Sequence, residues 1–182
     1  MLESSASMTG PRSAGVWKAV TAGFAAFIVA TVLMVPPADA AIVPQKSIAG
    51  VRLFMKKPEV LARLGRPDGR VVLKNPFTEG RFLRLRFGRT RVLFSGTTRS
   101  SIVYSVETRD RRQRTRKGTG VGSTRAKLRQ AHPAIRCESL SGLSSCYFGK
   151  FLPFKTVTVF YLRKKPGLPA RVERVSLGYV LD

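Results

Sequence analysis

The sequence predicts an α+β protein built of two tandem units, each a short helical segment packed on a small antiparallel sheet of three or four strands. Three observations lead to this fold class. A helix-forming motif occurs twice along the chain. Short segments rich in β-branched and aromatic residues, separated by turn residues, follow each copy. A charge-free stretch before the first copy indicates export, so the folded part is expected to begin after it.

The N-terminal segment has the pattern of a secretory signal peptide. Residues 19–35 carry no charge, follow a basic stretch, and lead into two prolines and a small-x-small ending. We therefore expect a signal peptide over residues 1–40, cleaved between Ala40 and Ala41. The competing interpretation is an uncleaved anchor, because the uncharged stretch lies just short of the roughly 20 residues that cross a bilayer. Contact with a membrane is expected to be only transient unless this segment is retained.

The chain is strongly basic, with a net charge of +23 over 182 residues. Within the first forty residues, Arg12 and Lys18 are balanced by Glu3 and Asp39, so the excess lies in the remainder. Such a charge predicts attraction to polyanions and says nothing about the fold. Export argues against nucleic acid as the natural ligand. The expected location is secreted or in a cell envelope, and the excess of arginine over lysine favours a bacterial source.

The only two cysteines, Cys137 and Cys146, follow the predicted signal peptide. An even number of cysteines in an oxidising compartment predicts one disulfide bond. A structural zinc site is not expected, because these two thiols and His132 do not supply four ligands.

The first copy of the repeated motif is "GVRLFMKKPEVLARLG", residues 50–65. Pro58 suits the first turn of a helix, and Glu59 places a carboxylate near its N-terminus. Val60 and the leucines that follow recur at helical spacing, and Gly65 ends the helix.

The second copy is "GTGVGSTRAKLRQAHP", residues 118–133, at a constant offset of 68 residues from the first. Ser123 or Thr124 can cap its helix, and Pro133 ends it. Internal repetition of this kind sets the fold, and two copies indicate a tandem pair rather than a solenoid.

Strand-like segments follow both helices. In "RFLRLRF", Leu83, Leu85 and Phe87 alternate with Arg84 and Arg86, as expected for a strand with one buried face and one wet face. The segments after the first helix are residues 70–74, 81–87, 91–95 and 101–107, and those after the second are 134–137, 146–149, 156–162 and 171–180. The predicted division is a signal peptide over 1–40, a first unit over 41–110, a basic joint over 111–117 and a second unit over 118–182.

The two motifs resemble the opening motif of the SmpA/OmlA (BamE-like) and beta-lactamase-inhibitor-protein-like family. That motif is a short apolar piece, then Gly-Met-Thr or Gly-Ser-Thr, then a helix ending in Leu-Gly-x-Pro. "IAGVRLFMKKPEVLARLGRPD" resembles it except that Phe54 replaces the glycine and Lys56 the capping threonine. Residues 118–133 resemble its Gly-Ser-Thr form. The resemblance implies helix-plus-sheet units, export, and work by binding rather than catalysis.

Catalytic and nucleotide-binding motifs are not expected. The glycines of "GTGVGS", residues 118–123, lack the spacing of a dinucleotide loop and the Gly-Lys-Ser/Thr ending of a P-loop, so we interpret them as a turn before a helix. His132, the only histidine, aligns with apolar Leu64 and is interpreted as a packing residue. The acidic residues are scattered. We therefore expect no enzyme activity, no cofactor and no bound metal.

The expected function is that of an exported binding module, which recognises an acidic protein or envelope component through basic sheet faces. One alternative is a sequence-independent binder of polyanions, such as an envelope polymer or anionic lipid. A narrower one is an enzyme inhibitor of the beta-lactamase-inhibitor kind, which titration against such enzymes would test. The predicted contacts to an anionic partner are Arg84, Arg86, Arg111, Arg112, Arg114, Arg116, Lys117 and Arg125.

Overall fold

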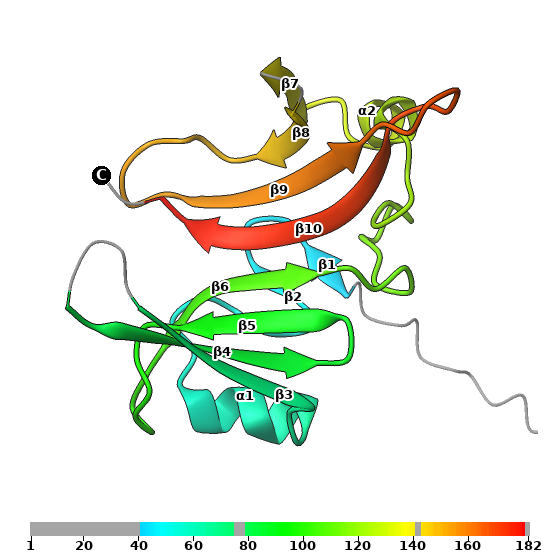
Figure 1. Cartoon of the computed structure of the whole chain (residues 1–182). Coiled ribbons are helices and arrows are strands. Elements are labelled where there is room, and N and C mark those ends of the chain that lie inside the picture. Colours follow the sequence, from blue (N-terminus) through cyan, green and yellow to red (C-terminus); the bar gives the residue numbers. More distant parts are fainter. Residues whose placement is uncertain (1–40, 75–78, 141–142, 181–182) are drawn as a thin grey trace, which may run out of the picture. The chain divides into compact units, whose positions relative to one another are not determined.

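The computed structural model describes residues 41–74, 79–140 and 143–180 (Figure 1). The predicted signal peptide, with Ala40 at its end, lies outside the described residues. The elements, in chain order, are β1 (Ile42–Val43), β2 (Ser47–Ile48), α1 (Lys57–Leu64), β3 (Gly69–Lys74), β4 (Arg81–Phe87), β5 (Thr90–Phe94), β6 (Val103–Thr108), α2 (Arg125–Ala131), β7 (Arg136–Leu140), β8 (Leu143–Phe148), β9 (Thr156–Arg163) and β10 (Arg171–Tyr179).

Eight of the strands form one antiparallel sheet in the order β3-β4-β5-β6-β10-β9-β8-β7. Each half of the chain supplies four neighbouring strands, and the last strand of each half lies in the middle. There, β6 and β10 pair directly, with Val106 opposite Leu177 and Thr108 opposite Val175. The outermost strands of the sheet are therefore β3 and β7.

The predicted fold class, two tandem units each with its own small sheet, is wrong. The mixture of helix and strand is present, but the strands form one eight-stranded sheet and a small hairpin of β1 and β2. Two separate sheets would leave β6 and β10 as edges, each with a row of unpaired backbone N–H and C=O groups. Pairing the two strands satisfies those groups and joins the hydrophobic surfaces of both halves.

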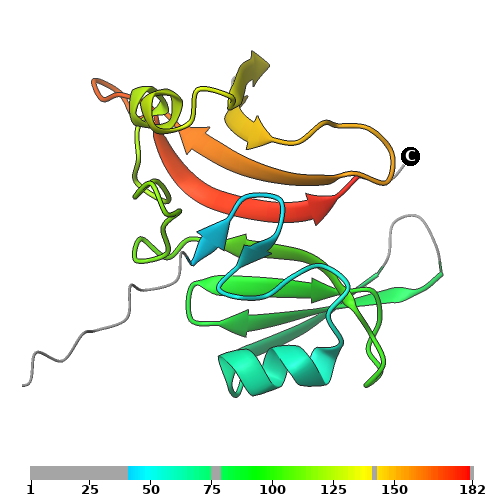
Figure 2. The same ribbon diagram turned by 180° about the vertical axis from the view of Figure 1, so that it is seen from behind.

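One face of the sheet carries a single continuous core. Phe94 from the first half and Phe160 from the second are fully buried in the same hydrophobic cluster. Val60 of α1 and Leu128 of α2 are fully buried in it as well, so both helices pack on this face. β2 contacts both β6 and β10, and Figure 2 shows the β1–β2 hairpin lying across the middle strands. This face, which we call the core face, is closed to solvent.

The alternation in β4 follows its prediction. Leu83 and Leu85 are buried on the core face, and Phe87 packs against the same cluster. Arg84 and Arg86 therefore project from the opposite face, which we call the outer face. Within the described part of the chain, neither helix is long and apolar enough to cross a membrane.

Candidate functional site: a basic surface on and beside the sheet

The outer face carries a row of charged side chains that strand pairing aligns. Arg86 lies opposite Arg91, which lies opposite Glu107, and Arg136 ends the row at the other edge of the sheet. The full row, read across the strands, is Gly69, Arg86, Arg91, Glu107, Ser176, Val159, Tyr147 and Arg136. Arg86 and Arg91 place basic charge on the half of this face formed by β4 and β5, whereas Val159 and Tyr147 are buried there in a second, smaller hydrophobic cluster.

Glu107 organises the centre of this face. Its carboxylate lies 3.3 Å from a guanidinium nitrogen of Arg174, 3.5 Å from Arg109 and 3.7 Å from Arg91. The guanidinium carbon of Arg174 also sits 4.1 Å from the centroid of the Tyr161 ring, a cation–π contact. One carboxylate thus holds three arginines in place, and the positive charge around it exceeds its own.

Arg84 and Arg86, both predicted contacts, differ in how firmly they are held. Arg84 is half-buried and has no carboxylate within 4.0 Å among the described residues. The Arg86 Nε donates to Asp68 at 2.6 Å, and the other oxygen of that carboxylate accepts from the backbone N–H of Gly88. These hydrogen bonds lower the pKa of Asp68 below its ordinary value. Arg86 is therefore partly neutralised, whereas Arg84 is free to meet an anion.

The predicted joint over 111–117 does not act as one patch. Arg112 is tied to Asp110, whose pKa its guanidinium lowers. Arg116 and Lys117 are exposed and line no cleft among those described. Arg111 and Arg114 turn toward the end of the sheet, where both line clefts. Of the basic residues predicted in this joint, only Arg111 and Arg114 therefore lie together at the clefts.

The clefts also contain residues that the sequence did not assign to a site. Arg89, Arg109, Arg163, Lys165 and Arg171 line the first cleft together with Arg111. They come from the β4–β5 turn, the end of β6 and the β9–β10 turn. These segments meet only because β6 pairs with β10, so no local pattern could have grouped them.

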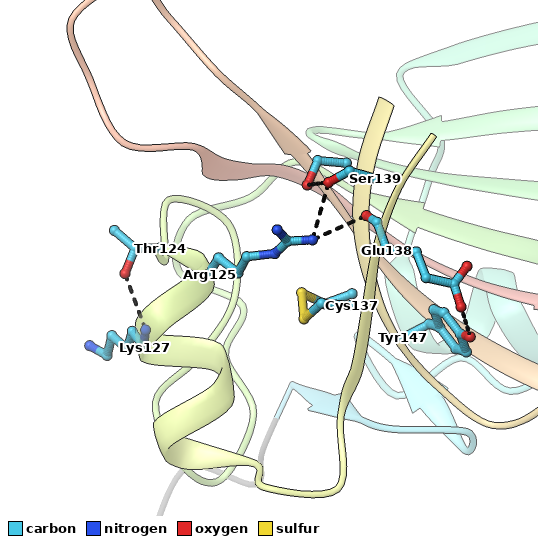
Figure 3. Close-up of a disulfide and its surroundings, with 9 residues drawn as sticks. Thr124, Arg125, Lys127, Cys137, Glu138, Ser139 and Tyr147 are labelled. Carbon is cyan, nitrogen blue, oxygen red and sulfur yellow. Dashed lines mark hydrogen bonds between the residues drawn. A yellow bond between two sulfur atoms is a disulfide. The ribbon is translucent and has the colours of Figure 1, made fainter. Parts of the chain in front are cut away.

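Arg125, another predicted contact, has a structural role. Its Nη2 donates to the backbone oxygen of Glu138 and to the Oγ of Ser139, each at 3.2 Å, which ties α2 to β7 (Figure 3).

The Cys137–Cys146 disulfide is confirmed and joins register partners on β7 and β8. A disulfide is compatible with an extracytoplasmic location. Beside it, the hydroxyl of Tyr147 donates to the Glu138 carboxylate, and this hydrogen bond raises the pKa of Tyr147.

His132 lies in a hydroxyl network beneath the connection between β6 and α2. Its Nε2 is 2.8 Å from the Oγ1 of Thr119, which is 2.8 Å from the Oγ1 of Thr115. Burial lowers the pKa of His132, with a smaller contribution from the nearby charge of Lys117. Both threonines are buried, whereas His132 itself is partly exposed. Among the described residues, no group of three or more His, Cys, Asp and Glu side chains could hold a metal ion.

Comparison with protein-family models, curated proteins and solved structures finds no match to this chain. The resemblance to the SmpA/OmlA and beta-lactamase-inhibitor-like proteins therefore rests on the two motifs alone.

Proposed function

We propose that this protein is an exported, non-catalytic binding module which recognises an acidic partner protein through the basic outer face of its sheet. The observation that carries the proposal is the register of the strands. It aligns Arg84, Arg86 and Arg91 on a face over which neither helix packs. An acidic partner would gain charge-assisted hydrogen bonds there, and arginine suits carboxylates because it can donate two parallel hydrogen bonds.

The rigidity of this face supports recognition of a protein. A face built on paired strands presents its side chains at fixed spacing, and Glu107 holds three of its arginines in position. Electrostatic complementarity between rigid surfaces gives specificity and fast association. Export to an envelope or to the exterior, with removal of residues 1–40, belongs to the same proposal, and the disulfide is compatible with it.

The test compares two charge-reversed variants for binding to a partner recovered from envelope extract at moderate salt. Arg84→Glu/Arg86→Glu changes the outer face. Arg66→Glu/Arg129→Glu makes the same change in net charge at two exposed positions, one after α1 and one on α2. We expect the first variant to weaken binding roughly tenfold or more, since charge-assisted contacts are each worth about 1.5–3 kcal/mol. The control should bind within about twofold of the unmodified protein.

The second candidate function is sequence-independent binding of polyanions, which the net charge of +23 favours. It predicts that both variants lose affinity equally, and that binding to any polyanion falls steeply with salt concentration. That result would replace the proposal of a specific acidic protein partner. Recovery of no partner at any salt concentration would also contradict the proposal of a specific protein partner.

A further inference from the structure

Two adjoining clefts lie at one end of the sheet, beside the connection between β6 and α2. Their volumes are about 400 Å³ and about 490 Å³. The segments that meet there are the β4–β5 turn, the connection after β6 and the β9–β10 turn, at the right-hand end of the sheet in Figure 1. Both clefts share Arg111 and Arg171, so these two side chains stand between them.

The clefts concentrate positive charge. The first is lined by six basic side chains and one acidic side chain, that of Glu173. The second is lined by Arg111 and Arg171 again, together with Arg114 and Lys127, and by no acidic residue. Six of these eight basic residues are arginines. Volumes of several hundred Å³ are typical of sites for small molecules.

In the part of the chain that the structure describes, most of these basic side chains have no carboxylate within 4.0 Å. Glu173 lies 3.0 Å from Arg109 and 3.6 Å from Arg163. Among the described residues, Arg111 and Arg171 have no carboxylate within 4.0 Å. Arg163 and Arg171 also lie directly opposite each other on β9 and β10, and like charges in that position destabilise a sheet. An anion bound between these two side chains would relieve the repulsion.

Backbone and side-chain hydrogen bonds hold the wall between the clefts in place. The N–H of Gly122 donates to the backbone oxygen of Val172 at 2.7 Å, and the N–H of Val172 donates to that of Ser123 at 2.8 Å. The Nη1 of Arg171 donates to the backbone oxygen of Gly122 at 3.0 Å, which fixes its guanidinium at the rim. The Arg171 guanidinium is thus positioned before any ligand arrives, and this lowers the entropy lost on binding.

We propose that these clefts form one binding site for a compact ligand carrying several closely spaced phosphate or carboxylate groups. The guanidinium group of arginine suits both phosphate and carboxylate, because the oxygens of either group can accept two parallel hydrogen bonds from it. Val121, Leu168 and Pro169 line the first cleft and would contact the carbon skeleton that carries the charges. The site does not depend on the proposed function of the outer face, because Arg84 and Arg86 are not part of it.

Isothermal titration of the purified protein with inorganic tripolyphosphate, and separately with citrate, tests the proposal. The variants are Arg111→Ala and Arg171→Ala. Arg116→Ala is the matched control, because Arg116 is exposed in the same connection, carries the same charge and lines neither cleft. Arg111→Ala keeps the test valid if Arg171→Ala disturbs the fold, since Arg111 is exposed and far less involved in holding the backbone.

We expect saturable binding with one site per chain. Each cleft variant should weaken it roughly tenfold or more, and the control by less than about twofold. Tighter binding of tripolyphosphate than of citrate would assign the site to phosphates, and the reverse to carboxylates. Equal loss in all three variants would show a response to net charge alone and overturn the proposal, as would the absence of saturable binding to either probe. Arg84→Glu/Arg86→Glu should leave tripolyphosphate binding intact, which separates this site from the outer face.

Discussion

The segments that lead into the two helices, residues 50–56 before α1 and 118–124 before α2, have the same backbone shape with different side chains. Gly50 and Gly118 have φ values of 72° and 71°, and both Phe54 and Gly122 have positive φ. In the first lead-in segment the N–H of Phe54 donates to the backbone oxygen of Val103 at 2.9 Å. In the second, the N–H of Gly122 makes the equivalent bond to Val172 at 2.7 Å.

The side chains distinguish the two lead-in segments. Thr124 caps α2, since its hydroxyl accepts from the N–H of Lys127, whereas Lys56 gives α1 no side-chain cap. Phe54 occupies, at φ 65°, a conformation that favours glycine, and its ring contacts Tyr179 with centroids 5.3 Å apart. Backbone pairing to the sheet therefore fixes the shape of the lead-in segment in both halves. The second half forms that shape with permissive residues, and the first half forms it under strain.

The largest expected difference between the halves comes from the disulfide, which only the second half contains. Cys137→Ala/Cys146→Ala should lower the free energy of unfolding by about 2.5 kcal/mol, because the bond restricts a short loop in the unfolded chain. Chemical denaturation of the variant and of the unmodified protein checks this. Intact mass under reducing and non-reducing conditions should confirm the bond beforehand. A change below about 0.5 kcal/mol would mean that the β7–β8 hairpin is held by its sheet contacts alone.

The second prediction concerns the glycine of the second lead-in segment. Gly122→Ala should destabilise the protein by about 1–2 kcal/mol, because φ is 91° there and an added Cβ strains the backbone although it meets no atom within 4 Å. Thermal and chemical unfolding measure the loss. Gly178→Ala is a suitable control, because an added Cβ meets nothing there either and φ is not positive. Equal losses in both variants would rule out backbone strain as the cause.

Sequence patterns predicted the local elements well and the global pairing poorly. The helix after Lys56, the helix after Thr124 and the strand over 81–87 are all present. The periodicity of a strand determines which side chains share a face, and Arg84 and Arg86 lie on one face accordingly. Nothing in β6 or β10 distinguishes a strand that ends a sheet from one that pairs with the other half. The separate-sheet prediction failed for that reason. For the same reason the sequence did not predict that Arg111 lies near Arg163 and Arg171.

The third prediction exchanges the caps. Thr124→Ala should cost about 1 kcal/mol of stability, and Lys56→Thr should gain a similar amount. The gain is expected because the backbone of Lys56, with φ −71° and ψ 149°, already has the extended conformation of a capping residue. Unfolding curves measure the stability of both variants. Lys56→Ala, which offers no cap, is the control that separates capping from the loss of the lysine charge. If Lys56→Thr and Lys56→Ala stabilise equally, the effect comes from the removed charge and not from capping.

The smallest expected effect depends on pH and concerns His132, which aligns with Leu64 of the first half. Burial lowers the pKa of His132 in the folded protein below the ordinary value of 6.5. The unfolded chain therefore binds a proton more readily, and the stability associated with the neutral ring is lost as the pH falls through 6.5 and below. His132→Leu, which copies the first half, should remove this part of the pH dependence. Because Leu cannot bond to Thr119, the variant should also be somewhat less stable near pH 8.

Unfolding midpoints of both proteins between about pH 5 and pH 8 measure this difference in slope. The midpoint of the unmodified protein should fall more steeply below pH 6.5 than that of the variant. Parallel curves would mean that the ring is hydrated in the folded protein and that protonation costs nothing there. In that case the hydroxyl network of Thr115 and Thr119 would accommodate the charged ring, and the two halves would differ at this position in packing only.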